Sequence, residues 1–173
     1  MNSHKELVAV AAAQLKRWKC LPICTEMVTQ NRSGEIPDAI GWTARASILI
    51  ECKASRSDFL ADRDKLFRYI LPDRGVGDFR FYFTNPGVIT KETDIPLGWG
   101  VYEIIDGKPK YKFGVRYTSL EVGKKLKELY KNDDKTDFNN YTKILYSEAC
   151  IIAGLPIDNP TEISDLICDV ISK

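Results

Sequence analysis

Two acidic residues and a lysine have types and a spacing that suit phosphoryl chemistry. Asp38 follows Pro37 after a polar turn. Glu51 and Lys53 are separated by one residue, Cys52, at the end of an apolar run. Side chains alternate along a strand, so we expect Glu51 and Lys53 on one face of it and Cys52 on the other. A turn between two strands would bring Asp38 beside them.

This trio predicts a metal site. Two carboxylates held close together repel each other, and each loses hydration when it is buried. A divalent cation offsets both costs, and carboxylates, a backbone carbonyl and waters suit Mg²⁺ or Mn²⁺. We expect Asp38, Glu51 and the backbone carbonyl of Cys52 to be the ligands. The ion would lower the pKa of a bound water, and Lys53 would orient that water and stabilise the developing oxyanion.

A third acidic ligand has three candidates. Glu6 can reach the site from the first predicted helix, but it follows Ser3 by three residues, as in a capping box. We therefore favour capping as the role of Glu6. Glu26 and Glu35 are the alternative third acids, and the spacing favours neither.

The segment after the acidic strand suits the binding of phosphate. Ser55, Arg56 and Ser57 open a predicted helix, where free backbone N–H groups favour an anion; helix capping explains the same residues. Lys65 and Tyr69 are four residues apart and share a face of that helix. We expect these residues to contact nucleic acid.

Two further acids in this helix have structural interpretations. Asp58 stands three residues after Ser55, which indicates a second capping box. Asp62 is expected to pair with Arg63 or Arg68 nearby.

The hydropathy pattern predicts a mixed α/β core with a helical tail. The part of the chain after Thr118 is predicted to be helical. A hairpin turn is expected at Asp106-Gly107. Helices are expected at about 5–19 and 57–70, and strands near 23–29, 38–41, 46–53, 79–83, 99–105 and 110–115.

Composition limits the class of protein. The 173 residues are 44% hydrophobic and 28% charged, with no apolar run of the roughly 18–20 residues that a membrane helix needs. We expect a cytoplasmic protein that spans no membrane. A net charge of +1 argues against coating of nucleic acid through a large positive field, although a local basic face suffices for an enzyme. Five irregularly spaced cysteines and one histidine do not indicate a zinc site.

The acidic segment resembles a known signature. Pro37-Asp38 followed by Glu51-Cys52-Lys53 is similar to the motif of the PD-(D/E)XK nuclease superfamily, whose core order is helix, three strands, helix, strand. A longer likeness, covering about 23–105, resembles the MmcB-like DNA-repair nucleases of that superfamily and ends after about Asp106. It is carried by the runs 51–63, 81–86 and 98–101 and by Tyr69.

The resemblance implies a restriction-endonuclease-like mixed sheet flanked by helices over residues 1–117, with a helical C-terminal extension over 118–173 packed on it. It implies an Mg²⁺- or Mn²⁺-dependent nuclease with Asp38, Glu51 and Lys53 as catalytic residues, acting on nucleic acid that we expect to be DNA. The alternative is a catalytically silent module of this fold that binds nucleic acid or a protein. The retained acids and lysine argue against that alternative, and no glycine-rich phosphate loop indicates another phosphoryl enzyme.

Overall fold

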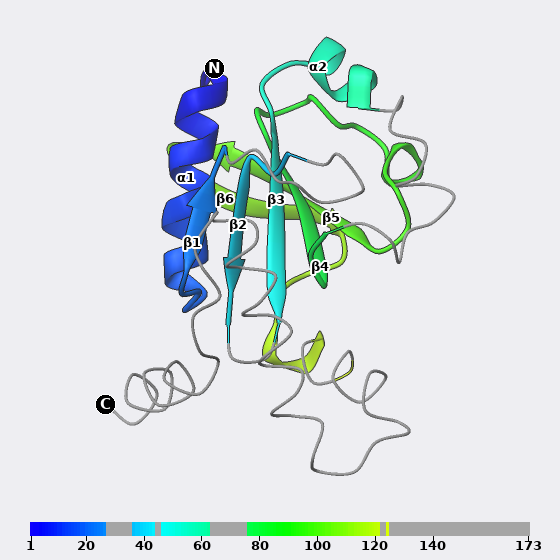
Figure 1. Cartoon of the computed structure of the whole chain (residues 1–173). Coiled ribbons are helices and arrows are strands. Elements are labelled where there is room, and N and C mark those ends of the chain that lie inside the picture. Colours follow the sequence, from blue (N-terminus) through cyan, green and yellow to red (C-terminus); the bar gives the residue numbers. More distant parts are fainter. Residues whose placement is uncertain (27–35, 44–45, 63–75, 122–123, 125–173) are drawn as a thin grey trace, which may run out of the picture.

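The computed structural model describes residues 1–26, 36–43, 46–62, 76–121 and 124 (Figure 1). Several of the predictions lie outside these residues. They concern Glu35, Arg63, Lys65, Arg68, Tyr69 and nearly all of the helical extension over 118–173.

A six-stranded mixed sheet forms the centre of the described structure, with strand order β1-β2-β3-β4-β5-β6. β3 pairs in parallel with β4, and β4 with β5, whereas the other neighbours are antiparallel. With helices flanking the sheet, this confirms the predicted mixed α/β architecture. The strands are β1 (Ile23–Thr25), β2 (Ala39–Trp42), β3 (Ser47–Lys53), β4 (Phe79–Thr84), β5 (Trp99–Ile105) and β6 (Lys108–Gly114); the helices are α1 (His4–Arg17), α2 (Arg56–Ala61) and the 3₁₀ turn η3 (Glu92–Asp94).

Helix α1 begins at the predicted capping box. The Ser3 side chain accepts a hydrogen bond from the Glu6 N–H, and the Glu6 carboxylate accepts one from the Ser3 N–H. Leu7, Ala11 and Leu15 recur every fourth residue and are fully buried. This stripe packs α1 against β1, β2, β3 and β4.

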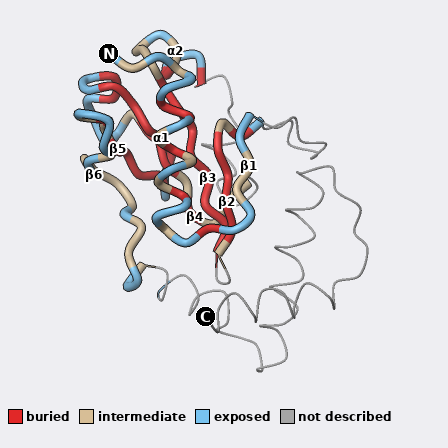
Figure 2. Tube along the Cα trace, turned by 90° about the vertical axis from the view of Figure 1, so that its left-hand side faces the viewer, coloured by how far each residue is buried: buried red, intermediate tan, exposed pale blue. Residues whose placement is uncertain are grey.

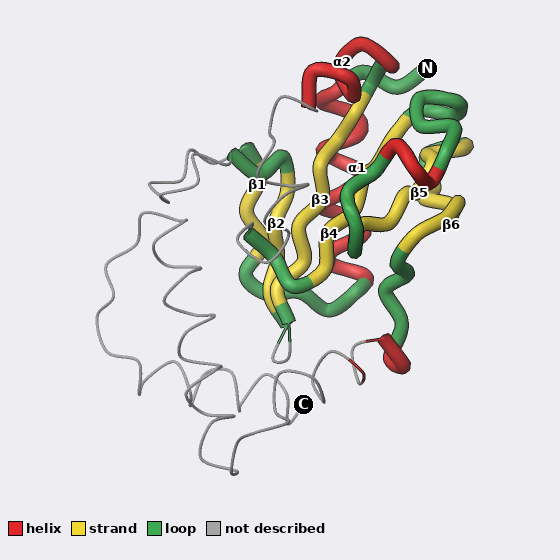
Figure 3. Tube along the Cα trace, turned by 90° about the vertical axis from the view of Figure 1, so that its right-hand side faces the viewer, coloured by secondary structure: helices red, strands yellow, loops and turns green. Residues whose placement is uncertain are grey.

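The sheet buries a different cluster on each face. Along β3, Ile48, Ile50 and Cys52 face α1, whereas Leu49 belongs to the opposite cluster. The loop that carries η3 covers that opposite face (Figures 1 and 3). All seven residues of β3 are buried, so β3 is a central strand, as its apolar run indicated (Figure 2).

The β5–β6 hairpin confirms the predicted turn. Asp106 and Gly107 have φ values of 51° and 68°, and positive φ at both central residues is the conformation that favours Asp-Gly in two-residue hairpins. In the part of the chain that the structure describes, no helix is long and apolar enough to cross a membrane.

Candidate active site

Asp38 and Glu51 come together across two antiparallel strands. Ala39 pairs with Ile50, and continuing this register by one step places Asp38 opposite Glu51. The Cys52 N–H donates a 2.7 Å hydrogen bond to Oδ2 of Asp38, which fixes that carboxylate beside β3. The prediction that a strand holds Asp38 is wrong by one residue, because β2 begins at Ala39. Its side chain nevertheless lies where the turn was expected to bring it.

Lys53 lies on the same face as Glu51, as strand alternation predicted. Its Nζ is 3.3 Å from Oδ1 of Asp62, 3.6 Å from Oε2 of Glu51 and 4.0 Å from Oδ1 of Asp58. The Glu51 and Lys53 side chains are 2% and 9% exposed. Water therefore screens these charges weakly, and their mutual interactions are strong.

The surrounding acids control the charge of Lys53. Burial by itself would lower the pKa of the Lys53 ammonium, but Glu51, Asp62, Asp58 and Asp38 outweigh that effect and raise the pKa above its ordinary value. Lys53 is consequently protonated at neutral pH. The field at its ammonium is negative, which also favours a cation in this part of the molecule.

Two residues in this cluster were missed by the sequence reasoning. The pairing of Asp62 with Arg63 or Arg68 lies outside the described residues; within them, Asp62 accepts hydrogen bonds from Lys53 and from the hydroxyl of Tyr82, the latter at 2.9 Å. Two signals could have indicated them. Asp62 stands one helical turn after Asp58, and Tyr82 alternates with three phenylalanines, which places its hydroxyl on the site face of β4.

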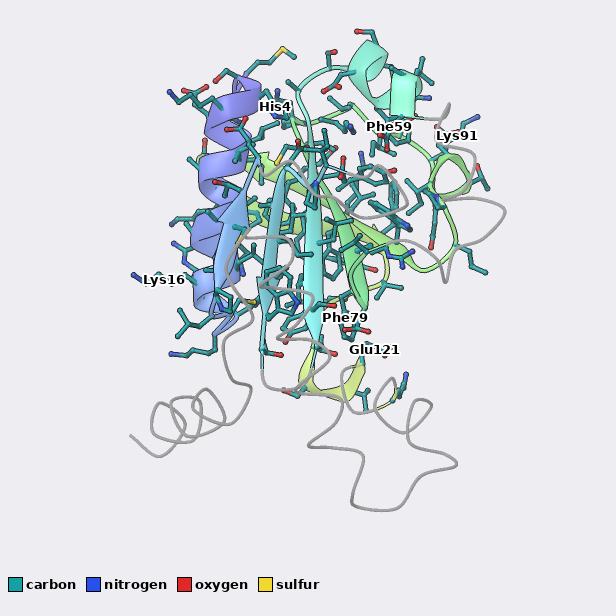
Figure 4. All side chains as sticks on the ribbon, in the orientation of Figure 1. His4, Lys16, Phe59, Phe79, Lys91 and Glu121 are labelled. Atoms are coloured by element: carbon teal, nitrogen blue, oxygen red, sulfur yellow. The ribbon has the colours of Figure 1, made fainter. Side chains whose placement is uncertain are left out.

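His4 is a further neighbour of the site, although the sequence assigned it no role. Its Nε2 lies 3.5 Å from Oδ1 of Asp38 and 3.9 Å from Oε1 of Glu26. Figure 4 shows His4 at the start of α1. The preceding Asn2 is anchored by the buried Asn85 side chain, which accepts hydrogen bonds from Nδ2 and the N–H of Asn2 and donates one to its carbonyl.

The possible role of Glu6 as a metal ligand is not supported by its position. Glu6 is exposed, and Oε2 of its carboxylate accepts hydrogen bonds from the N–H and hydroxyl of Ser3 at 2.6 and 2.8 Å. Hydrogen bonds to Ser3 accordingly lower the pKa of Glu6. Among the alternative acids, Glu26 approaches the site, because its N–H donates to the Asp38 carbonyl at 3.0 Å.

Helix α2 is tied to the core by the residues that were expected to bind phosphate. The Ser55 hydroxyl accepts from the Asp58 N–H and lies 2.9 Å from the Ser57 hydroxyl. Asp58 accepts from the N–H of Ala54, not of Ser55, so the predicted second capping box is only partly formed. The Arg56 guanidinium binds Oδ2 of Asp94 at 2.9 Å, and it also donates to the Val88 carbonyl at 3.1 Å and lies over the Phe59 ring.

The donor chemistry of the site fits a hard divalent cation. Within the described residues, no three His, Cys, Asp or Glu side chains form a complete metal-binding group. Mg²⁺ does not need one, since it commonly keeps several waters and uses one or two carboxylates. Asp38, which immediately precedes β2, and Glu51 of β3 supply such carboxylates from facing positions.

Comparisons with known proteins define no family for this chain. No protein-family model matches. Short stretches are similar to Chaperone protein HtpG: 45% identity over 51 residues in Clostridium perfringens and 46% over 48 residues in Alkaliphilus oremlandii, covering 30% and 28% of this chain and 8% of each chaperone. The match in Oceanobacillus iheyensis has 41% identity over 93 residues, or 50% of this chain and 14% of the chaperone. The chain thus spans only a small part of these relatives' length.

One solved structure is similar over most of the chain. It is the SPO1766 protein of unknown function from Silicibacter pomeroyi, with 17% identity and a TM-score of 0.47, covering 92% of this chain and 99% of that chain. At this TM-score the likeness carries no argument about function.

Proposed function

We propose that this chain is an Mg²⁺- or Mn²⁺-dependent nuclease with a restriction-endonuclease-like fold of the PD-(D/E)XK type. The observation that carries the proposal is the placement of Asp38 opposite Glu51 across β2 and β3, with Lys53 buried on the same face. The order α1, β1, β2, β3, α2, β4 also agrees with the core order that the sequence resemblance implies.

Each residue of the trio has a distinct part in hydrolysis. Asp38 and Glu51 would hold the metal ion, together with the backbone carbonyl of Cys52. When bound, the ion would supply an activated water and would neutralise charge on the phosphate. Lys53, which its acidic neighbours keep protonated, orients the attacking water and stabilises the oxyanion that forms on the phosphate.

The substrate class proposed is nucleic acid, and DNA in particular. Ser55, Arg56 and Ser57, with Lys65 and Tyr69, remain the proposed contacts to the phosphate backbone. Arg56 would have to exchange Asp94 for a phosphate, and a guanidinium suits either partner because both accept two parallel hydrogen bonds.

The test is a cleavage assay on labelled single- and double-stranded DNA and RNA, with Mg²⁺ or Mn²⁺ and with EDTA. The full chain should cleave at least one DNA substrate, and EDTA should abolish cleavage. Asp38→Asn and Glu51→Gln should each lower the rate by on the order of a thousandfold, equivalent to about 4 kcal/mol of transition-state stabilisation. Asp106→Asn is the matched control, because it removes an exposed carboxylate from the β5–β6 turn and should change nothing.

The same assay separates the proposal from a silent binding module. Such a module would bind the labelled substrates without cleaving them. The Glu51→Gln variant would then bind them as the wild type does and would likewise show no cleavage. Metal-dependent cleavage that survives Glu51→Gln would show that the hydrolytic site lies elsewhere.

A further inference from the structure

Asp62 is a buried acid that the hydrolysis proposed above does not use. It is only 4% exposed, and burial of a carboxylate is costly unless an opposite charge and hydrogen bonds compensate. Both are present, on different oxygens: Oδ1 lies 3.3 Å from Nζ of Lys53, and Oδ2 accepts the 2.9 Å hydrogen bond from Tyr82. One carboxylate therefore links β3 to β4.

Aromatic packing holds the Tyr82 hydroxyl in place. Tyr82 is fully buried, and its ring stacks on Trp99 with centroids 4.5 Å apart and an interplanar angle of 26°. Phe59 of α2 meets the same ring edge-on, at 5.4 Å and 89°. These are favourable aromatic geometries, and contacts on two sides leave the ring little freedom to turn. Its hydroxyl is thus a fixed donor for Asp62.

Asp62 and Glu51 share the Lys53 ammonium. Nζ lies 3.3 Å from Asp62 and 3.6 Å from Glu51. The shorter contact is with the acid outside the proposed metal-binding pair. An ammonium held mainly by Glu51 would compete with a divalent cation for that carboxylate, because both are cations that bind carboxylate oxygens.

We propose, on the basis of the nuclease function above, that Asp62 is a positioning residue that draws Lys53 away from Glu51 and so keeps the Glu51 carboxylate available to the metal ion. Tyr82 fixes Asp62 in the orientation that does this. Asp62 acts through Lys53, and Phe59 links α2 to the same arrangement.

The test measures Mn²⁺ binding by the full chain, by titration calorimetry or electron paramagnetic resonance. Asp62→Asn keeps the shape of the side chain and removes its charge, so Lys53 should turn to Glu51. Mn²⁺ affinity should fall roughly ten- to a hundredfold, the range seen when groups that orient metal ligands are removed. Adding Lys53→Met to Asp62→Asn should restore most of the affinity, since the competing ammonium is then absent. A merely structural role for Asp62 predicts no such rescue.

Two tyrosine variants sharpen the test. Tyr82→Phe removes one hydrogen bond and keeps the ring, so its loss of Mn²⁺ affinity should be smaller, within about tenfold, and Lys53→Met should again reverse it. Tyr102→Phe is the matched control: Tyr102 is also buried on a neighbouring strand, but it belongs to the cluster on the α1 face. Its Mn²⁺ affinity should equal that of the wild type. If Asp62→Asn fails to fold, the Tyr82→Phe pair of variants tests the same inference.

The outcomes distinguish this inference from the proposed function. Wild-type Mn²⁺ affinity in Asp62→Asn, or no recovery on adding Lys53→Met, would overturn the positioning role alone. Glu51→Gln that binds Mn²⁺ as tightly as the wild type would overturn the proposed metal site, and the positioning role with it.

Discussion

The two faces of the sheet use the same strands for different purposes. On the α1 face, Phe81 and Phe83 of β4 pack with Trp18 and Tyr102, and Phe79 packs edge-on against Tyr117, in one cluster of aromatic rings. On the opposite face, β3 ends near α2 (Figure 1). There Lys53 contacts both Glu51 and Asp62, and the Tyr82 hydroxyl from β4 donates to Asp62.

The difference shows how a buried charged site can be carried by a stable sheet. Apolar burial stabilises the fold at roughly 25 cal/mol per Å², and α1 makes that contribution on one face. The other face retains apolar residues such as Leu49 and Val101 along the middle of the sheet. The buried charges of Glu51, Lys53 and Asp62 gather where β3 ends, and there ion pairs and hydrogen bonds offset the cost of desolvation.

The largest effect is expected from placing a charge on the wrong face. Cys52 is fully buried against α1, one residue from Glu51. Cys52→Asp should destabilise the fold by roughly 3–5 kcal/mol, because the described residues that pack with Cys52 on that face form an apolar cluster, which would leave the new charge uncompensated. Glu51→Gln, which removes a buried charge, should be far less harmful. Urea denaturation of both variants measures the difference, and equal stabilities would contradict this account of the two faces.

A large effect on activity alone is expected at Lys53. Lys53→Met should lower turnover by on the order of a hundredfold, or about 2.7 kcal/mol, while Mn²⁺ still binds. In the proposed mechanism Lys53 orients the attacking water and stabilises the transition state, whereas Asp38 and Glu51 hold the ion. Single-turnover cleavage and Mn²⁺ titration on the same samples provide the measurement. Cleavage at the wild-type rate would remove Lys53 from the proposed mechanism.

A smaller effect is expected where α2 meets the loop over the site face. If Arg56 exchanges Asp94 for a phosphate, Arg56→Ala should weaken binding similarly for all sequences and reduce the log–log salt slope by about 0.9. Asp94→Asn, which frees the same guanidinium, should strengthen binding. Binding titrations over a salt series test both variants. An unchanged slope in Arg56→Ala would mean that Arg56 only ties α2 to the loop.

The smallest effect is expected from Glu103, an acid on β5 away from the cluster. Burial by itself would raise the pKa of Glu103, but hydrogen bonds from Lys112 and the Gly87 N–H and the charge of Lys112 lower it below 4.5. A lowered folded-state pKa adds stability that is present above the unfolded-state value and is lost as the pH falls through the folded-state value. In Glu103→Gln, the free energy of unfolding should therefore decrease less steeply as the pH is lowered, measured by thermal unfolding between about pH 7 and 3. Lys112→Met should reduce the pH dependence of stability similarly. A pH dependence equal to that of the wild type in both variants would contradict the proposed contribution of Glu103.

Local patterns were sufficient to predict most of the described fold. The Ser3–Glu6 capping box, the Asp106-Gly107 turn and the buried run of β3 each depend on neighbours a few residues apart. The same alternation along β3 predicted that Glu51 and Lys53 share a face and that Cys52 lies on the other. Such features follow from backbone geometry, which adjacent residues determine.

Only the tertiary structure decided which partners complete the site. Lys53 contacts Asp62, 9 positions further along the chain, and Asp62 in turn accepts a hydrogen bond from Tyr82, a further 20 positions along. His4 contacts Asp38 from the start of α1. Arg56 finds Asp94, 38 positions away, although its sequence context indicated a free phosphate ligand. These contacts depend on the strand order and register of the sheet and on how α1 and α2 pack against it. Strand order, register and helix packing depend on how the chain as a whole buries its apolar residues. The spacing of residues along the sequence does not determine these long-range contacts directly.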